Sequence, residues 1–545
     1  MEAIDFERLI ESLKRPEAYP HPAVPVTHIE THISHVLLAG DFAYKLKKPV
    51  KLGFLDFSTL ERRRHDCEEE LRLNQRLAAD LYIAVVAVTG TPAAPQIGGS
   101  DSVLEYAVQM RRFPQEALLD RQPLTHQLMI RLAETVAEFH AQIPIADDRE
   151  GFGTPEAVLA PLLDNLAELR VHSLTPENQA RLERLDAWIH QRSQALFAVF
   201  EQRRQHGYVR ECHGDMHRGN IAVVDGEIRI FDALEFSPVL RWIDTASEVA
   251  FVIMDLEQDG ESGFARLFLN RYLERSGDYG ALSVLDFYKV YRAMVRAKVQ
   301  AIRLDQDSQH PETASDQQPC IDYLALAESY TQPRHPYLLI VSGLSGSGKS
   351  FLASQLREAL PLIHLRSDVE RKRIFGLIET ARTFSSVDAG IYFPSATNWT
   401  YDRLHRLADA ILISGYAVLV DATFIERGRR EHFRDLAHRH RVGFATIALD
   451  APPHILRQRL IRRHALGGDA SEANLAVLEQ QVAIRQGAST TEMADTLIID
   501  TTNTPPLTEI LVMLEAILDT GRPPEARVNT ALSEQSEDHH IEPSA

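Results

Sequence analysis

The chain has 545 residues, more than a single hydrophobic core usually organises, which indicates two or three domains. Hydrophobic residues make up 44% of it and charged residues 25%, a composition typical of globular proteins that excludes disordered and fibrous classes. The formal net charge of -19 disfavours nonspecific binding to nucleic acid or anionic membranes, and no apolar run reaches membrane-spanning length.

The cysteines and the opening residues bear on the compartment of the protein. Cys67, Cys212 and Cys320 lie far apart and form no C-x-x-C pair, so neither a disulfide framework nor a zinc ribbon is indicated. The opening residues lack the basic segment and apolar core of an export signal. We therefore expect a cytoplasmic protein.

The first hundred residues show strand patterns and one helix pattern. Apolar and polar residues alternate over residues 26–50 around the turn Ala39-Gly40-Asp41, which predicts a hairpin of two strands. The spacing of leucines over residues 60–81 predicts an amphipathic helix. Further strands are predicted over residues 82–88 and 103–110. A small sheet lobe is therefore expected at the start of the chain.

Helical patterns dominate residues 124–299, with short strand patterns only over 221–224 and 228–231, so a helical lobe is expected next. Residues 303–319 have almost no large apolar side chains, as in an exposed linker. Residues 321–330 again show a helical pattern and are expected to pack back onto the first module. We place the domain boundary near Gln332.

Strand and helix patterns alternate in the second half of the chain, which predicts a parallel, doubly wound α/β sheet. The strands are predicted over residues 337–342, 417–420, 444–449 and 496–499. Residues 521–545 contain no aromatic residue and are expected to be disordered. The expected domains are residues 1–332 and 333–520, followed by the tail 521–545.

A phosphate-binding P-loop is the clearest motif. The G-x-x-x-x-G-K-[ST] pattern follows an apolar strand pattern and precedes a helix pattern. Its members are Gly343, Leu344, Ser345, Gly346, Ser347, Gly348, Lys349 and Ser350. Backbone amides of such a loop bind phosphate, while Lys349 would neutralise the β- and γ-phosphates of ATP and Ser350 would ligate Mg²⁺. The alternative is an ordinary glycine-rich turn.

Charged residues downstream of the P-loop suit phosphoryl transfer. Asp368 follows a short apolar run and could deprotonate an acceptor hydroxyl, although Ser367 or Asp368 could equally cap a helix. Asp421 ends the apolar run AVLVD, where a Walker-B carboxylate orients magnesium. Four arginines, at positions 457, 459, 462 and 463, suit a lid over phosphates or a solvated face.

Residues 336–520 resemble small-molecule P-loop kinases of the AAA-33, zeta-toxin and polynucleotide-kinase-like group, because the P-loop, Asp368, the DAT sequence at Asp421 and the arginines occur in the expected order. The resemblance implies that Asp368 activates the acceptor hydroxyl. It also implies that Arg459 and Arg463 stabilise the transferred phosphoryl group. Acceptors vary widely across the group, so the resemblance does not identify the substrate.

A second motif, H-G-D-x-H-x-x-N, runs from His213 to Asn220 and precedes IRIFDALEF. It resembles the catalytic loop of aminoglycoside and choline kinase-like phosphotransferases, which have a two-lobed, protein-kinase-like fold. The resemblance implies that Asp215 is the catalytic base and that Asn220 and Asp232 bind Mg²⁺. The alternatives are a zinc site on His213 and His217 and a purely structural loop.

The nucleotide-binding lysine of this module is expected on the second strand of the hairpin. Lys45 occupies the lysine position of the kinase A-x-K pattern, and Lys47 lies on the same strand face. Glu70, among three adjacent glutamates with Glu68 and Glu69, is chosen as the ion-pair partner. The hairpin lacks the G-x-G-x-x-G loop of protein kinases. The resemblance covers residues 26–300, with residues 110–114 as the hinge between lobes.

The order of the two modules resembles that of bacterial bifunctional proteins with an aminoglycoside phosphotransferase-like and an ATP-binding domain. We therefore predict two sites for ATP and Mg²⁺, each transferring γ-phosphate to a hydroxyl of an unidentified small molecule. No specific nucleic-acid or membrane partner is expected, and the oligomeric state is left open. The alternative is a regulatory protein in which the amino-terminal module is a non-catalytic pseudokinase and only the P-loop module is active.

Overall fold

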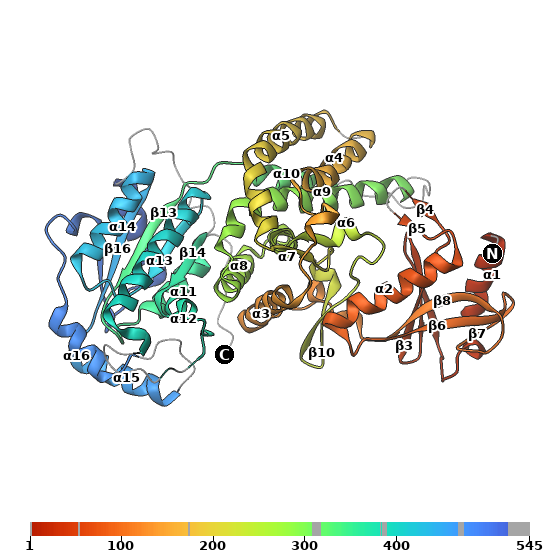
Figure 1. Ribbon diagram of the computed structural model, residues 1–545, viewed down its shortest axis with the longest axis horizontal. Helices are drawn as coiled ribbons and strands as arrows, with labels where there is room; N and C mark the ends of the chain where they lie inside the picture. Colours follow the sequence, from red (N-terminus) through yellow and green to blue (C-terminus); the bar gives the residue numbers. More distant parts are fainter. Residues whose placement is uncertain are drawn as a thin grey trace, which may run out of the picture. The chain divides into compact units, whose positions relative to one another are not determined.

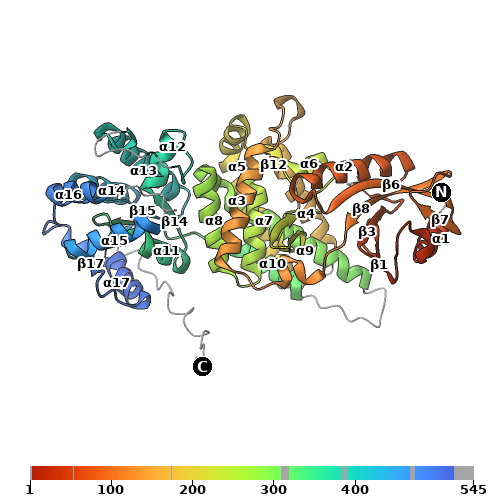
Figure 2. The same cartoon turned by 90° about the horizontal axis from the view of Figure 1, so that it is seen from below.

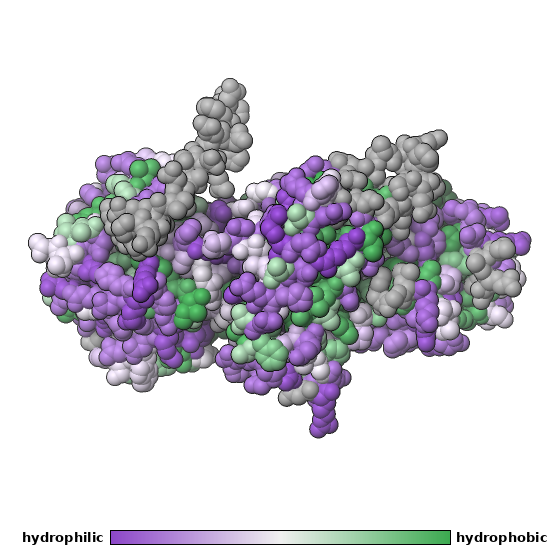
Figure 3. Space-filling model, turned by 90° about the horizontal axis from the view of Figure 1, so that it is seen from above, coloured by the Kyte–Doolittle hydropathy of each residue, from purple (hydrophilic) through white to green (hydrophobic). Residues whose placement is uncertain are grey.

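The computed structural model describes residues 3–52, 55–172, 175–307, 318–381, 383, 390–466 and 473–520. Its contacts divide the chain into two compact units, Met1–Gln332 and Pro333–Ala545. The middle of the expected linker, 308–317, and the tail 521–545 lie outside the described residues. The face of the molecule seen in Figure 3 is mainly hydrophilic where it is coloured, with apolar residues in separate smaller patches.

The first unit begins with an antiparallel six-stranded sheet of order β1-β2-β3-β8-β6-β7 (Figure 1). The strands are β1 (Val26–Glu30), β2 (Ser34–Ala39), β3 (Phe42–Lys47), β6 (Tyr82–Thr91), β7 (Ala94–Ile97) and β8 (Val103–Arg111), with a separate small pair β4 (Lys51–Leu52) and β5 (Leu55–Asp56). The predicted turn at Gly40 joins β2 and β3. The predicted hairpin is therefore confirmed as β2 and β3. The prediction missed a third strand, β1, which pairs with β2 through a second turn where Thr31 accepts and donates hydrogen bonds with Ser34.

Two helices cover the apolar side chains of this sheet. Helix α1 (Ala3–Leu13) buries Phe6 and Leu9 with Leu37 of β2. Helix α2 (Leu60–Ala78) begins where Thr59 accepts a hydrogen bond from the Arg62 amide, and it packs on β6 and β8. Its start agrees with the sequence pattern, and it ends three residues before the predicted end.

A helical lobe completes the first unit. Its helices are α3 (His126–Gln142), α4 (Pro155–Val171), α5 (Pro176–Gln205), α6 (Pro238–Arg241), α7 (Thr245–Gln258), α8 (Ser262–Ser276), α9 (Leu282–Asp307) and α10 (Gln318–Ser329). Two small sheets, β9 (Val209–Glu211) with β12 (Trp242–Asp244) and β10 (Ile221–Val224) with β11 (Glu227–Ile230), lie among them. The sequence predicted the strands β10 and β11, but it did not predict β9 and β12. Helix α10 packs on α9, as its helical pattern predicted.

The second unit is a five-stranded, fully parallel sheet of order β14-β15-β13-β16-β17. Its strands are β13 (Tyr337–Ser342), β14 (Leu362–Arg366), β15 (Ala417–Asp421), β16 (Gly443–Asp450) and β17 (Thr496–Asp500). Its helices are α11 (Lys349–Ala359), α12 (Ser367–Ile374), α13 (Pro394–Ile413), α14 (Arg427–His440), α15 (Pro453–Leu466), α16 (Leu475–Ile484) and α17 (Leu507–Thr520).

Helices cover both faces of this sheet, so the predicted doubly wound architecture is confirmed. Helices α11 and α17 pack on one face, where Leu352 and Leu514 meet Leu339 and Ile447. Helices α13 and α14 cover the other face (Figure 2). Strand β13, the first strand of this unit in the sequence, lies at the centre of the sheet. The loop after β13 is therefore at the middle of the carboxyl edge, where such sheets bind ligands. Among the described helices, none has the length and apolar character needed to cross a membrane.

Candidate active sites

The loop from His213 to Asn220 follows β9 and is held by hydrogen bonds of its own residues. Nε2 of His213 lies 2.9 Å from the Phe231 carbonyl oxygen and donates to it, and Nδ1 accepts from the Asp215 amide at 3.3 Å. Burial lowers the pKa of His213, which keeps the ring neutral. Both ring nitrogens of His213 are thus engaged, and Nδ1 of His217 accepts from the Gly219 amide at 3.1 Å, which disfavours the zinc alternative for these two histidines.

The residues expected as base and metal ligands in the first unit are Asp215 and Asn220 on this loop and Asp232 after β11. The Asn220 amide donates to the carboxylate of Asp215 at 3.1 Å and to its carbonyl at 3.0 Å. Burial raises the pKa of Asp215, but His217 and other nearby positive charge outweigh it, so the net shift is well downward. Asp232 adopts a left-handed backbone with φ of 66° just after β11. Carboxylate and amide oxygens of this kind suit Mg²⁺.

A buried charge cluster connects the two candidate lysines to the same carboxylate. Lys45 Nζ lies 2.9 Å from Glu70 Oε1 and 2.5 Å from Asp232 Oδ1. Lys47 Nζ lies 2.8 Å from Glu70 Oε2 and also pairs with Glu235. Burial raises the pKa of Glu70, but Lys45 and Lys47 outweigh it and lower the pKa to about 2. Only Lys45 of the two lysines therefore contacts both Glu70 and Asp232.

The neighbouring glutamates on α2 have other partners. Glu68 accepts a hydrogen bond from Arg64, and Glu69 accepts two from Arg72. Glu70 alone of the three is fully buried and faces the lysines. The sequence pattern therefore selected the right glutamate for the ion pair, whereas it gave no sign of Glu235.

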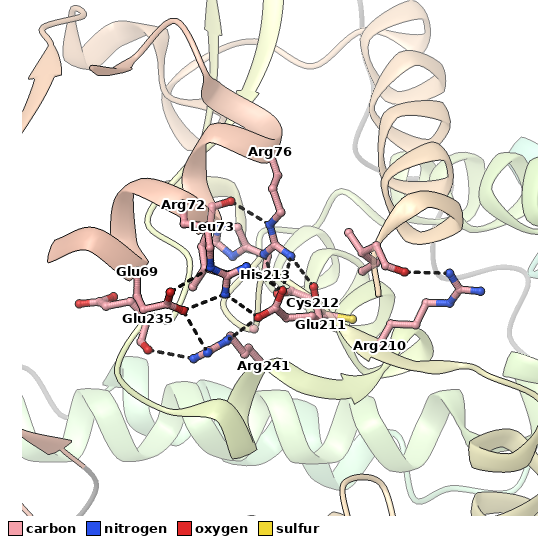
Figure 4. Close-up of polar contacts among 12 residues, drawn as sticks. Glu69, Arg72, Leu73, Arg76, Arg210, Glu211, Cys212, His213, Glu235 and Arg241 are labelled. Atoms are coloured by element: carbon pink, nitrogen blue, oxygen red, sulfur yellow. Dashed lines mark hydrogen bonds and ion pairs between the residues drawn. The ribbon is translucent and has the colours of Figure 1, made fainter. Parts of the chain in front are cut away.

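Helix α2 is also bonded to the strand that leads into the catalytic-type loop (Figure 4). Arg76 donates to the backbone carbonyls of Glu211 at 2.6 Å and of Cys212 at 3.1 Å, directly before His213. Arg72 donates to the Glu211 carboxylate at 2.7 Å. The helix that carries Glu70 is thus held against the loop that carries Asp215. Sequence analysis missed these arginines, because only the fold brings α2 and β9 together.

A buried glutamate of α7 holds the start of the loop. Glu248 Oε1 accepts from the amides of His213 at 2.6 Å and Gly214 at 2.8 Å, and Oε2 lies 2.7 Å from Nε2 of His140. Burial raises the pKa of Glu248, but the His140 hydrogen bond and nearby rings lower it to about 2. Glu248 was missed as well. Its only sign in the sequence is a carboxylate directly before the apolar run VAFVIM.

Glu248→Gln is expected to weaken the acid dependence of folding. The folded pKa of about 2 is below the ordinary 4.5, so the ionised Glu248 stabilises the fold above about pH 4.5 and loses that contribution as the pH falls toward 2. Wild type should lose about 2 kcal/mol from this group between about pH 6 and pH 3. Urea unfolding at both pH values measures the loss. Equal pH dependence in wild type and Glu248→Gln would contradict the assignment.

In the second unit the predicted P-loop joins β13 to α11. Gly343 has φ of 155° and Gly346 has φ of 85°. A Cβ at Gly343 would lie 2.8 Å from the Leu449 carbonyl oxygen, and one at Gly346 would lie 2.9 Å from that of Leu456. The tight packing under the loop thus requires glycine at both positions. The loop leads directly into α11 at Lys349, so it adjoins the positive start of this helix.

The P-loop serine and the strand-end carboxylate are in direct contact. Ser350 donates a hydrogen bond to Asp421 Oδ2 at 2.6 Å. Burial raises the pKa of Asp421, but His364 and Lys349 outweigh it and lower the pKa to about 2. Lys349 donates to the carbonyl of Leu344 at 3.0 Å, and burial lowers its pKa. An ionised carboxylate beside a hydroxyl is an oxygen donor set that fits Mg²⁺.

A cavity of about 550 Å³ brings the remaining predicted residues together. Lys349, Asp368, Asp421, Arg459 and Arg463 all line it. The cavity also has lining residues that the sequence did not suggest, namely Arg371, Tyr392, Thr397, Asn398, Tyr401, Glu426, Arg429 and Gln481.

Three details refine the expectations for this cavity. Asp368 is in the first turn of α12, whose N-cap is Arg366, so the helix-cap alternative for Ser367 or Asp368 is wrong. Arg459 donates to Thr501 at 2.8 and 2.7 Å. Gln481 of α16 accepts from the Ser345 amide at 2.8 Å and so already contacts the P-loop.

Two family models match the chain and define its class. The phosphotransferase enzyme family (APH) matches residues 54–285, and an AAA domain family (AAA_33) matches residues 338–487. Both resemblances drawn from the sequence are thereby confirmed, and the chain is a phosphotransferase of the kinase type, a class that uses ATP.

The chain is 31% identical over 477 residues to the uncharacterized protein Rv2004c of Mycobacterium tuberculosis, across 86% of this chain and 92% of that protein. It belongs to the family of that protein. Two solved structures match parts of the chain. A choline/ethanolamine kinase family protein from Mesorhizobium loti matches 60% of this chain and 94% of its own, with 13% identity and a TM-score of 0.37. A sugar kinase from Janibacter matches 34% and 99%, with 18% identity and a TM-score of 0.27.

Proposed function

We propose that the protein is a tandem ATP-dependent kinase of the cytoplasm, with modules at residues 1–332 and 333–520 that each phosphorylate a hydroxyl of a small molecule. The observation that carries the proposal is the cavity of the second unit, where a P-loop lysine, the Ser350–Asp421 pair and the carboxylate of Asp368 line one space. The first unit supports the proposal with the same kinds of group, namely a carboxylate base at Asp215, a lysine at Lys45 and oxygen ligands for a metal ion.

In the P-loop module, Asp368 accepts the proton of the acceptor hydroxyl as its oxygen bonds to the γ-phosphorus. The bond from that phosphorus to the β,γ-bridging oxygen breaks, and ADP leaves with the electron pair. Lys349, Arg459 and Arg463 compensate negative charge on the phosphates. Ser350 and Asp421 would hold Mg²⁺, which supplies further charge neutralisation when bound.

In the amino-terminal module, Asp215 accepts the hydroxyl proton, and Lys45, oriented by Glu70, binds phosphate oxygens. Asn220 and Asp232 would hold Mg²⁺. Lys45 is paired at 2.5 Å with Asp232, so the expected phosphate-binding lysine and an expected metal ligand contact each other in this structure. Together with the missing glycine-rich loop, this contact favours the second candidate function, a regulatory protein whose amino-terminal module binds nucleotide without transfer.

The test is phosphate transfer from labelled ATP to pooled cell metabolites by the intact protein, with and without a Mg²⁺ chelator. Kinase activity predicts one or more labelled products that require Mg²⁺. Binding of ATP with no labelled product in any pool would contradict the proposal for both modules.

Lys45→Met and Lys47→Met separate the nucleotide-binding lysine from its neighbour. Lys45→Met is expected to lower kcat/KM of the amino-terminal module roughly 100-fold with little change in stability, because Glu70 keeps Lys47 as a partner. Lys47→Met leaves buried Glu235 without this lysine and is expected to cost about 3 to 5 kcal/mol of unfolding free energy. Kinetics and urea unfolding of both variants measure these effects. The reverse pattern would assign the role to Lys47.

A further inference from the structure

Two arginines line the P-loop cavity together with Asp368. Arg371 belongs to α12 and Arg429 to α14. The Arg371 guanidinium carbon lies 4.9 Å from the centre of the Tyr392 ring, and that of Arg429 lies 4.1 Å from the centre of the Tyr401 ring. Stacking on an aromatic ring holds a planar guanidinium in place and keeps its edge available for hydrogen bonds.

The hydrogen bonds of Arg371 leave part of its guanidinium unused. The residue is only 7% exposed. Its Nη1 donates to two neutral oxygens, the Ile391 carbonyl and the Thr397 hydroxyl, each at 3.2 Å. Its Nε is buried and has no partner among the described residues. A buried cationic donor without a partner is costly, which is a reason to expect a ligand there.

Arg429 has a similar unused donor. Its Nη2 lies 2.9 Å from Glu426 Oε1 and donates to Asn398 Oδ1 at 3.4 Å. Its Nη1 is buried and has no partner among the described residues. Glu426 balances part of the charge of Arg429, whereas none of the Arg371 contacts above is to a carboxylate, so Arg371 is the cation of this pair that lacks a neutralising partner among these contacts.

Asp368 and Arg371 are neighbours on one face of α12, since they are three residues apart in the same helix. A ligand that presents a hydroxyl to Asp368 therefore places the rest of its atoms near Arg371. The P-loop amides, Lys349, Arg459 and Arg463 already provide for the phosphates of ATP, so the two stacked arginines remain for the acceptor.

On the basis of the kinase function proposed for this module, we propose that its acceptor is an anionic polyol. The molecule carries a hydroxyl that Asp368 deprotonates and a carboxylate or phosphate group that Arg371 and Arg429 bind through paired N–H donors. The acceptor oxygen bonds to the γ-phosphorus, its proton passes to Asp368, ADP leaves, and the anionic group is unchanged. Cationic acceptors such as aminoglycosides are disfavoured at this module.

The test compares acceptors of matched size in the full-length protein, with Asp215→Asn silencing the amino-terminal module. The probes are a neutral six-carbon polyol, a six-carbon sugar acid, a hexose monophosphate and an amino sugar. We expect the highest Lys349-dependent kcat/KM for the sugar acid or the hexose monophosphate. The better of these two anions identifies carboxylate or phosphate as the bound group.

Arg429→Met and Arg371→Lys test the two side chains. Arg429→Met is expected to raise KM for the anionic acceptor at least tenfold, with KM for ATP unchanged. Arg371→Lys keeps the charge of a buried position but loses the paired donors, and it should also raise KM for the acceptor. The matched control is Arg427→Met, because Arg427 lies in the same helix, does not line the cavity and is 48% exposed.

Three outcomes are decisive. The inference is overturned if the neutral polyol or the amino sugar is the best acceptor, or if Arg429→Met leaves KM for the anionic acceptor unchanged. Both results would leave the kinase function intact. If no acceptor of any class receives phosphate in a Lys349-dependent reaction, the proposed kinase function of this module fails, and the inference fails with it.

Discussion

Lys349→Ala is expected to lower phosphoryl transfer by the P-loop module roughly 100- to 1,000-fold, the range found when one preorganised charge-stabilising donor is removed. Lys349 is the cation of the loop between β13 and α11, and it lines the same cavity as Asp368 and Asp421. Negative charge on the γ-phosphate and the departing ADP would lose its nearest compensating group. The measurement is kcat/KM for ATP in the Asp215→Asn background, which removes the contribution of the first unit.

The fold of the variant should be little affected. Among the described residues, Lys349 donates one hydrogen bond, to the Leu344 carbonyl, and burial already lowers its pKa, so its charge is not a major source of stability. The thermal midpoint of Lys349→Ala should therefore stay near that of wild type. Unchanged ATP affinity together with unchanged turnover would contradict a P-loop kinase site. A loss of turnover that accompanies unfolding would not count as support.

The features that the sequence predicted well are those determined by consecutive residues. The P-loop from Gly343 to Ser350 needs only its own glycines, the strand before it and the helix after it. The parallel sheet around it follows from apolar strands that alternate with helices. The catalytic-type loop from His213 to Asn220 is similarly local, and the family comparison bears out both resemblances.

The features that the sequence could not predict depend on contacts between distant segments. Lys47 meets Glu235, which lies 188 positions later, and Glu248 reaches His140 across the helical lobe. In the sequence, Arg371 is one of several charged residues in a row. Only the structure shows that it is buried in α12 beside Tyr392. Period-two alternation placed Lys45 and Lys47 on one strand face, and only the packing of α2 shows that both reach the same glutamate.

The turns between short strands were also difficult to predict. The hairpin pattern over residues 26–50 missed the turn between β1 and β2, because its residues, Thr31 to Ile33, lack the glycine or asparagine that usually marks a tight turn. The bonds between Thr31 and Ser34 replace that signal. This turn is therefore stabilised by side-chain hydrogen bonds and does not need a residue with an unusually flexible backbone.

Asp215→Asn is expected to lower turnover of the amino-terminal module roughly 100- to 10,000-fold, the range for loss of a general base. The substitution keeps the shape of the side chain and a group that can accept from Asn220, so the loop should remain folded. Because the pKa of Asp215 lies well below its ordinary value, wild type keeps an ionised base throughout the mildly acidic range. Acid should therefore not abolish its activity by protonating this group until the pH is far below neutral.

The matched control is Asp225→Asn, which makes the same chemical change at an exposed position with φ of 52° in the turn between β10 and β11. Asparagine tolerates this backbone conformation, so the control should keep both stability and turnover. Labelled products of the Lys349→Ala background report the amino-terminal module alone. If that background yields a product that Asp215→Asn removes and Asp225→Asn retains, the first unit is a kinase with Asp215 as its base. If the Lys349→Ala background binds ATP at this unit but yields no product, the unit is a nucleotide-binding regulator, and only the P-loop module transfers phosphate.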